Sequence, residues 1–440
     1  SGNRAVLGGG LFVGTGTGYV KQVDLDGVTF ANNTATHSGG GLYADQADVH
    51  ITGEKASSFT GNSAMGTTDD NGGGALYAMN SNVHITAAMN PTVAFMDGNW
   101  ASASGGAIFL RAAVGKSAWF SLIAPQGSGA PVITSNSATY LGGAIYVNAI
   151  GDGSTAQVVL FDTIIANNLA PQASAVQLYA GGNTQTRATL NMYANPFSSP
   201  CNVIQRCNRI SGNQSGDYGT VVAETSGQAR TVFQMDQGHL VNNITVNFGG
   251  LVDNIGPGND TWINNSVIAD NDFGNAPLAT ASGQFQINNT TIARNNRVSP
   301  AVIRSYGAPI TFHNNLVFQP EAPLLASSGG ADVNLCNLMV GNLTGLDNLV
   351  ARNIQYTTDP VFVNAGQGDY RIQVGSQARN RYASTGCASV AHEDLLGATR
   401  PDRPDLPTPY DMGAYEYGAV VDHLFNDSFD GEVASRPASP

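Results

Sequence analysis

The chain has 440 residues, of which 42% are hydrophobic and only 12% are charged, and its formal net charge is −13. Lysine and arginine number 19 against 32 aspartates and glutamates, which excludes the basic surface that binding to nucleic acid or anionic lipid requires. No apolar run approaches the ~18 residues of a membrane-spanning helix. The apolar residues instead recur in short alternating runs, which predict β-strands around a packed core.

An asparagine recurs along the chain, always three residues after a bulky apolar residue, as in Phe30-Ala-Asn-Asn33. It stands at Asn33, Asn62, Asn99, Asn136, Asn168, Asn213, Asn243, Asn271, Asn295 and Asn315. A recurring unit indicates a solenoid, in which each turn buries its apolar side chains by stacking on its neighbours. Because an amide both donates and accepts, we predict that these side chains form a continuous internal ladder.

Paired glycines mark a second position of the repeat, followed by a small, an apolar and an aromatic residue, as in Gly142-Gly-Ala-Ile-Tyr146. We expect the second glycine of each pair to form a sharp corner with positive φ, at Gly40, Gly74, Gly106 and Gly143. A third strand carries Asp48-Val-His-Ile-Thr52 and then Asn82-Val-His-Ile-Thr86. Each turn therefore contains three short strands separated by corners, and no window has the period of a helix.

These units predict an all-β solenoid of about 11–12 coils over residues 1–354, and their motifs resemble those of the right-handed parallel β-helix. Residues 355–418 are rich in Pro and charged residues, and we expect them to form a C-terminal coil and cap. Residues 419–440 form a tail that is either a sorting signal or a donor strand. Since no charged and apolar leader precedes Ser1, we expect an exported chain whose signal peptide has been removed.

The Gly-Gly-Ala-Ile-Tyr and Asn-rich turns resemble pectin-lyase-like β-helices, and in particular the repeats of polymorphic outer-membrane proteins. The end of the chain resembles the closing segment of choice-of-anchor Q domain proteins. The motifs that carry this second resemblance are Thr358-Asp-Pro-Val-Phe362, Gly368-Asp-Tyr-Arg-Ile372, Asp394-Leu-Leu-Gly397, Arg400-Pro401 and Asp411-Met-Gly-Ala-Tyr-Glu416. Both resemblances imply a bacterial, extracellular or cell-surface β-helix and say little about activity.

His50 and His84 are the best candidates for a catalytic base, with Asp48 and Glu54 nearby. Many β-helix proteins cleave acidic polysaccharides by β-elimination, which needs a base and a group that neutralises the substrate carboxylate. The alternation of these histidines with valine and isoleucine points both rings outward. The alternative interpretation is that they are ordinary surface residues of two equivalent coils.

Asp270 and Arg294 each precede a ladder asparagine, one turn apart, so their side chains are expected to lie side by side. The pair forms either a structural salt bridge or, together with Arg297 and Arg304, a small basic patch that binds substrate. An exposed pair of this kind contributes about 0–1 kcal/mol to stability.

Four cysteines are disulfide candidates, Cys201 with Cys207 locally and Cys336 with Cys387 at the end of the chain. No cofactor is predicted, with calcium as the alternative. The oxygen ligands that calcium would use lie at Asp24, Asp26, Asp69, Asp70, Asn71, Asp253, Asn254, Asn259 and Asp260. The same residues form ordinary turns by bonding their own backbone.

The sequence therefore predicts a structural, adhesive or glycan-binding role at a bacterial surface. The alternative is an enzyme that degrades a polysaccharide, either a lyase or a glycoside hydrolase. The partners expected are an extracellular glycan or a second copy of the chain. The N-terminal repeat begins without a cap, and Asp422-His-Leu-Phe-Asn-Asp-Ser-Phe429 is a candidate donor strand, so we hypothesise head-to-tail assembly.

Overall fold

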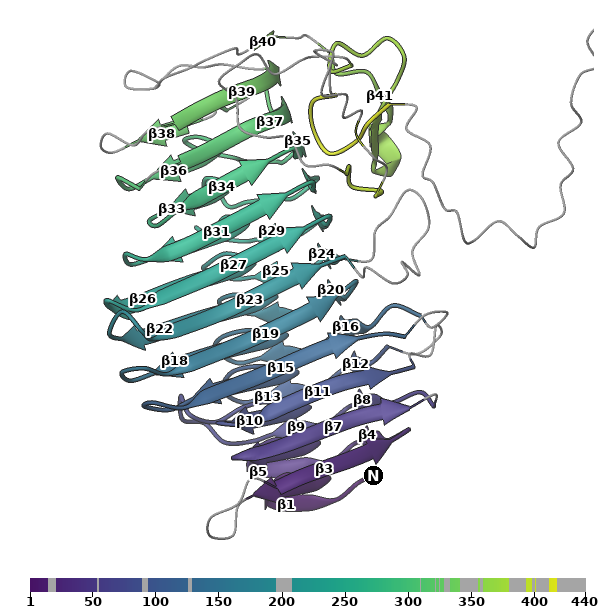
Figure 1. Cartoon of the computed structure of the whole chain (residues 1–440), viewed down its shortest axis with the longest axis vertical. Coiled ribbons are helices and arrows are strands. Elements are labelled where there is room, and N and C mark those ends of the chain that lie inside the picture. Colours follow the sequence, from purple (N-terminus) through teal and green to yellow (C-terminus); the bar gives the residue numbers. More distant parts are fainter. Residues whose placement is uncertain are drawn as a thin grey trace, which may run out of the picture.

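The computed structural model describes most of the repeat region and parts of the C-terminal third. The described residues are 1–14, 21–53, 55–88, 94–125, 129–194, 208–308, 310–320, 322–323, 325–327, 333–340, 355–356, 359–379, 393–397, 400 and 411–417. Their strands stack coil upon coil into an elongated solenoid (Figure 1). Cys201, Cys207, Cys387, the side chain of Cys336 and residues 419–440 lie outside this description. The disulfides and head-to-tail assembly stay predictions.

In two of the three parallel sheets, A and B, a coil contributes a single strand, and sheet A ends at β29 while sheet B continues to β38. Sheet A consists of β1 (Arg4–Leu7), β5 (Thr34–Ser38), β9 (Ser63–Ala64), β13 (Trp100–Ala101), β17 (Ser137–Ala138), β21 (Leu169–Ala170), β25 (Gln214–Ser215) and β29 (Ile244–Thr245). Sheet B consists of β2 (Leu11–Gly14), β6 (Leu42–Asp45), β10 (Leu76–Met79), β14 (Ile108–Ala112), β18 (Ile145–Ile150), β22 (Val176–Gly182), β26 (Val221–Gly227), β30 (Val252–Ile255), β33 (Ala279–Ala281), β36 (Ile303–Ser305) and β38 (Leu325–Ser327).

Sheet C contains a row of long strands and a row of short ones. The long strands are β3 (Lys21–Asp26), β7 (Ala47–Gly53), β11 (Asn82–Ala87), β15 (Ser117–Ile123), β19 (Thr155–Phe161), β23 (Arg187–Tyr193), β27 (Arg230–Asp236), β31 (Asn259–Asn264) and β34 (Phe285–Asn288). The short strands are β4 (Thr29–Ala31), β8 (Ser58–Thr60), β12 (Met96–Asp97), β16 (Val132–Thr134), β20 (Ile164–Ala166), β24 (Arg209–Ser211), β28 (His239–Val241), β32 (Val267–Ala269), β35 (Thr291–Ala293) and β40 (Gln355–Tyr356). β37 (Ile310–Phe318) and β39 (Val333–Val340) pair with both rows or continue them.

Alternation along each strand separates the core from the surface. In β7 the side chains of Val49 and Ile51 are fully buried, and the equivalent Val83 and Ile85 of β11 lie on them in register. One cluster of such residues continues from Val13 to Ala322. The predicted parallel β-helix is therefore confirmed, and in the described part of the chain the single helical element is the 3₁₀ turn η1 (Ala365–Gln367).

The corner between the short strands of sheet C and sheet A holds a row of buried asparagines. Asn99 Nδ2 donates to Asn136 Oδ1 at 2.9 Å, and it also donates to the carbonyl oxygen of Phe59 at 3.0 Å. The Oδ1 atom of Asn136 in turn accepts from the backbone nitrogen of Asn99 at 3.0 Å. Asparagine suits this position because its carbonyl and both amide hydrogens find partners without a net charge.

The row includes Asn3 as well as nine of the expected residues, but it does not include Asn315. The expected residues in the row are Asn33, Asn62, Asn99, Asn136, Asn168, Asn213, Asn243, Asn271 and Asn295. After Asn295 the row ends on Gln319, whose Oε1 accepts from the backbone nitrogen of Asn295 at 3.0 Å. Asn315 instead accepts from the backbone nitrogen of Thr290, at a different corner. The prediction for Asn315 is therefore wrong.

The paired glycines also differ from the expectation. The first glycine of each pair has positive φ, with 69° at Gly39 and 64° at Gly142, whereas the second does not. A Cβ atom on Gly40 would lie 2.3 Å from the carbonyl oxygen of Gly74 on the next coil. The second glycine is thus required because two backbones approach closely there, and the prediction of positive φ at this position is wrong.

The closing segment, residues 359–417, lies along the side of the solenoid in its described parts (Figure 1). It contains β41 (Phe362–Asn364), η1 and β42 (Asp369–Ile372), and the two strands are antiparallel. Tyr370, Leu395 and Tyr415 pack on residues of β28, β32 and β35. The outer side chains of these short strands are apolar and bind the described parts of the segment to the flank. The expectation that residues 355–418 form a C-terminal coil and cap stays a prediction.

Candidate functional site

The two histidines proposed as catalytic bases lie on adjacent coils and face outward. His50 of β7 and His84 of β11 are direct register partners, with ring centroids 5.2 Å apart. His50 Nε2 lies 3.0 Å from Asp48 Oδ1, and His84 Nδ1 lies 3.0 Å from the hydroxyl oxygen of Ser121. Burial, and secondarily the neighbouring His50, lower the pKa of His84, so its ring is neutral at neutral pH. Glu54, the other acid expected nearby, lies outside the described residues.

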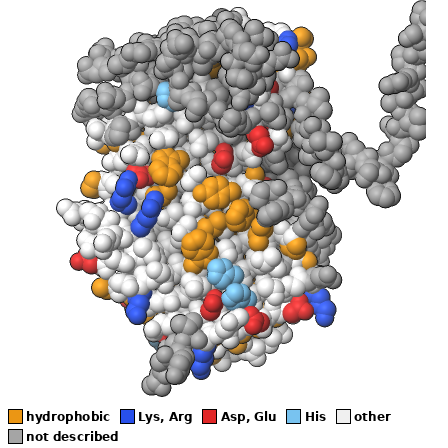
Figure 2. Space-filling model, viewed as in Figure 1, with side chains coloured by type: hydrophobic (Ala, Val, Ile, Leu, Met, Phe, Trp, Pro, Cys, Tyr) orange, Lys and Arg blue, Asp and Glu red, His pale blue; other side chains and the backbone are white. Residues whose placement is uncertain are grey.

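Beyond His84 the outer face of sheet C becomes aromatic. We call the surface formed by Trp119, Ser121, Phe161, Asn191, Tyr193 and Gln234 the aromatic tray. Ser121, Asn191 and Gln234 belong to one outward row of equivalent positions, and Val159 separates the first two. In Figure 2 hydrophobic side chains gather over β15, β19 and β23, next to the histidines.

Aromatic side chains flank this row on both sides. Trp119 stands two residues before Ser121 on β15, while Phe161 and Tyr193 stand two residues after the row on β19 and β23. The rings of Phe161 and Tyr193 are 6.1 Å apart, and the Tyr193 hydroxyl donates to Gln234 Oε1 at 3.1 Å. The tray residues carry no formal charge, so the surface combines half-buried rings with neutral hydrogen-bonding groups.

Sequence reasoning missed the tray because its residues differ in type from coil to coil. The signal that could have located it is register, since each member stands at an outward position equivalent to Asn82, His84 or Thr86. The outward positions of β3, β7, β11 and β15 around the histidines hold no lysine or arginine. Among the described residues of these strands there is thus no cationic side chain beside the histidines to neutralise a uronate carboxylate.

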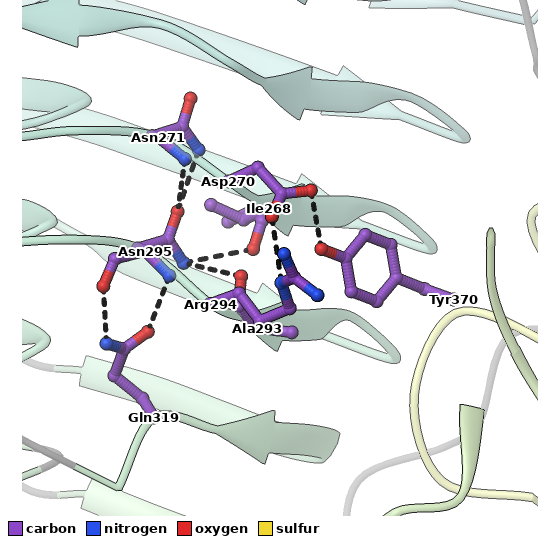
Figure 3. A network of polar contacts seen from close by, with 8 residues as sticks. All are labelled: Ile268, Asp270, Asn271, Ala293, Arg294, Asn295, Gln319 and Tyr370. Atoms are coloured by element: carbon purple, nitrogen blue, oxygen red, sulfur yellow. Dashed lines mark hydrogen bonds and ion pairs between the residues drawn. The ribbon is translucent and has the colours of Figure 1, made fainter. Parts of the chain in front are cut away.

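Asp270 and Arg294 lie side by side, as the spacing predicts (Figure 3). Arg294 Nε donates to Asp270 Oδ1 at 3.1 Å, and both residues have φ of 56°. They belong to a row of left-handed corner residues that precede the ladder asparagines, namely Asn32, Gly61, Gly98, Ser135, Asn167, Gly212, Asn242, Asp270 and Arg294. A left-handed conformation costs an ordinary side chain about 1–2 kcal/mol. Arg294 is the long side chain in a row otherwise made of small residues.

A cavity of about 390 Å³ opens between this pair and the closing segment. It is lined by Arg209, His239, Val241, Asn242, Asp270, Arg294, Gly366, Gln367, Gly368 and Tyr370. The Tyr370 hydroxyl donates to Asp270 Oδ2 at 2.6 Å. Burial, together with this hydrogen bond to a carboxylate, raises the pKa of Tyr370 above its ordinary value. Asp270 therefore joins the solenoid to a residue 100 positions away.

The other two arginines of the expected basic patch lie elsewhere. Arg297 Nε donates to Asp272 Oδ1 at 2.6 Å in the turn after β35. Arg304 belongs to β36 of sheet B, where its guanidinium carbon lies 5.1 Å from the ring centroid of Tyr306. The patch of four residues is thus corrected to one pair, Asp270 and Arg294, that lines the cavity.

Among the described residues no group of three or more His, Cys, Asp or Glu side chains is placed to hold a metal ion. Oxygens proposed for calcium have protein partners instead. Asp253 Oδ2 accepts from the backbone nitrogen of Gly219 at 2.8 Å, and Asp260 Oδ2 accepts from Arg230 at 2.6 Å. The described part of the chain also has no helix of the length and apolarity needed to cross a membrane.

Comparison with known families identifies the repeat. Residues 27–45, 56–79 and 132–148 match the Chlamydia polymorphic membrane protein repeat. Each matched stretch contains a ladder asparagine and the following glycine pair, which are the residues that form the two corners described above. No curated protein matches the chain. The chain thus carries repeats of the polymorphic membrane protein type, built into a parallel β-helix.

Proposed function

We propose that this protein is displayed at a bacterial surface and binds an extracellular glycan in the aromatic tray. The family whose repeats it carries is one of bacterial membrane proteins, which supports the location. The observation that supports glycan binding is the tray itself, where half-buried rings of Trp119, Phe161 and Tyr193 flank a row of neutral polar side chains.

Sugar rings match this surface chemically. They present apolar C–H faces, which pack on aromatic rings, and hydroxyl groups, which both donate and accept hydrogen bonds. Ser121, Asn191 and Gln234 supply hydroxyl and amide groups between the rings. Because the tray is uncharged and the chain has a net charge of −13, we expect a neutral glycan and not a polyanion.

The tray is tested by glycan-array screening followed by calorimetry with the best ligand. Trp119→Ala is expected to weaken binding about tenfold, since a large aromatic side chain in a binding surface contributes more than ~1 kcal/mol. Phe248→Ala is the matched control, because that ring is 83% exposed on a loop between sheets A and B. Equal affinity of the two variants would contradict the proposal.

The contact of 3.0 Å between His84 Nδ1 and Ser121 favours a second candidate, a polysaccharide-degrading enzyme that uses the tray as its substrate-binding surface. Incubation with polysaccharides would then release new reducing ends or, for a lyase, an unsaturated product that absorbs in the ultraviolet. His84→Ala should abolish either signal. Binding without product formation would leave glycan recognition as the function.

A further inference from the structure

The cavity between the solenoid flank and the closing segment has a charge opposite to that of the whole chain. Its lining contains two arginines, Arg209 and Arg294, and one aspartate, Asp270, so arginine and aspartate side chains alone give it a formal charge of +1. The chain as a whole carries −13. Its volume of about 390 Å³ falls within the ~300–1,000 Å³ typical of small-molecule sites.

Arg294 has the geometry of a ligand-binding residue. Its Nε atom is held by Asp270 Oδ1, so the guanidinium is oriented while its two terminal nitrogens make no hydrogen bond to the described residues. The side chain is 45% exposed, at the wall of the cavity. A planar guanidinium with two adjacent donors matches the two oxygens of a carboxylate.

Asp270 is fixed from both sides. One carboxylate oxygen accepts from Arg294 and the other accepts from the Tyr370 hydroxyl (Figure 3). It therefore orients the arginine and does not compete for its terminal nitrogens. Asn242 and Gln367 add amide groups to the cavity wall, which can hydrogen-bond the rest of a polar ligand.

We infer that this cavity is a separate binding site for a carboxylate, carried either by a small organic acid or by an acidic sugar. The excess of one positive charge matches a singly charged carboxylate better than a doubly charged phosphate or sulfate. Because Tyr370 and residues 366–368 supply one wall, the ligand contacts the solenoid and the closing segment together. Binding should therefore also hold the closing segment in place.

The test compares two variants with the same backbone conformation and the same kind of ion pair. Arg294→Asn introduces an asparagine at the left-handed corner. Asparagine suits this conformation, because Asn32, Asn167 and Asn242 adopt it at the equivalent corners of other coils. The matched control is Arg297→Asn, since Arg297 also has φ of 56° and donates its Nε to an aspartate, but away from the cavity. Both variants are expected to fold, and to melt no lower than the wild type.

Calorimetry on the full chain uses D-glucuronate, D-glucose, acetate and inorganic sulfate as probes. Glucuronate should bind the wild type and the Arg297→Asn variant alike, and the Arg294→Asn variant at least tenfold more weakly. Glucose should bind at least tenfold more weakly than glucuronate. If acetate binds as well as glucuronate, the bare carboxylate of a small acid suffices; if it does not, the sugar ring is also recognised.

Proteolysis gives a second readout, because glucuronate should slow cleavage of the closing segment in the wild type but not in the Arg294→Asn variant. Three results would overturn the inference: sulfate binding more tightly than the carboxylates, equal affinity of both variants for glucuronate, or no binding of any probe at millimolar concentration. A lower melting temperature for Arg294→Asn than for Arg297→Asn, with unchanged binding, would make Arg294 a structural residue.

Discussion

Asn136 in the solenoid and Arg400 in the closing segment are both fully buried polar side chains, but they are satisfied in opposite ways. Asn136 is one member of a neutral row in which every coil supplies the same group to the next. Arg400 is a single charge that holds a loop together, with Nη1 on Asp411 O and Glu416 Oε2 and Nη2 on Gly413 O. The solenoid therefore repeats one neutral contact from coil to coil, while the closing segment uses charged groups that each occur once, Arg400 with Glu416 and the buried Asp394 and Asp411 on backbone nitrogens.

The largest effect is expected from Arg400→Met. Breaking a buried ion pair by removing one partner costs about 3–5 kcal/mol, because the remaining charge and carbonyl groups stay buried. The closing segment should leave the flank and become sensitive to protease, while far-ultraviolet circular dichroism of the solenoid is retained. If proteolysis remains slow, Arg400 is not the residue on which docking depends.

Asn136→Ala tests how much the asparagine row contributes to the stability of the solenoid. It removes the acceptor of Asn99 and the donor to Asn168, so buried groups on both neighbouring coils lose partners, at about 1–3 kcal/mol. Thermal unfolding should show this as a lower melting temperature. Gln214→Ala is the control, because that exposed residue follows a ladder asparagine without joining the row. Equal melting of both variants would contradict the role of the ladder.

The two regions should also respond differently to pH. Burial, and secondarily the charge of Asp411, raise the pKa of Glu416 to about 7 from an ordinary 4.5. Because the folded-state pKa is raised, this group stabilises docking below the unfolded pKa and loses that contribution as the pH rises through 7. The protection factor of amide hydrogen exchange in residues 411–417, which is corrected for the intrinsic rise of the exchange rate with pH, should therefore fall between pH 5 and about 8.

Glu416→Gln is the control for this pH dependence, since the amide keeps an acceptor for Arg400 and does not titrate. In this variant the protection factors of residues 411–417 should not fall over that pH range. Burial also raises the pKa of three carboxyls in the described part of the solenoid, Glu224, Asp236 and Asp253, the last to about 6, so the comparison is made at residues 411–417. A loss of protection in residues 411–417 as the pH falls below 5 would contradict the assignment to Glu416.

The smallest effect is expected from Gly98→Asn. Gly98 has φ of 61° and open space where a Cβ would stand, and equivalent corners already hold Asn32 and Asn167. The change in unfolding free energy should stay within about 0.5 kcal/mol. Gly40→Ala is the contrasting variant, because its Cβ would meet the backbone of the next coil. The unfolding free energies of the two variants, measured by chemical denaturation, distinguish a glycine that is needed for its positive φ from one that is needed because two backbones approach closely.

The features that could be predicted from the sequence are those that recur from coil to coil. The ladder was readable because one residue type recurs at one position, and it was misassigned at Asn315 because the last member is a glutamine, Gln319, with the same chemistry and a longer side chain. The contact of Asp270 with Arg294 was readable from register alone. Tyr370 was not, since no spacing relates it to a strand 100 residues earlier.

The tray escaped prediction for a related reason. Its members share positions but not residue types, so Ser121, Asn191 and Gln234 form one row only after the strands are paired. The closing segment packs on the outer faces of β28, β32 and β35. This contact could not be predicted, because the apolar side chains of these strands do not differ in sequence from those of any buried strand. Patterns that recur can be recognised in a single chain, and contacts made once cannot.

The asparagine row also forms a line of side-chain dipoles that point the same way along the solenoid. From Asn33 to Asn271 each side-chain carbonyl faces the preceding coil and one amide hydrogen faces the next, so the amide dipoles of the row are aligned. Aligned hydrogen bonds polarise one another and strengthen as the row lengthens. An added coil is therefore held more firmly by a long stack than by a short one, and a coil placed in reverse would meet acceptor with acceptor.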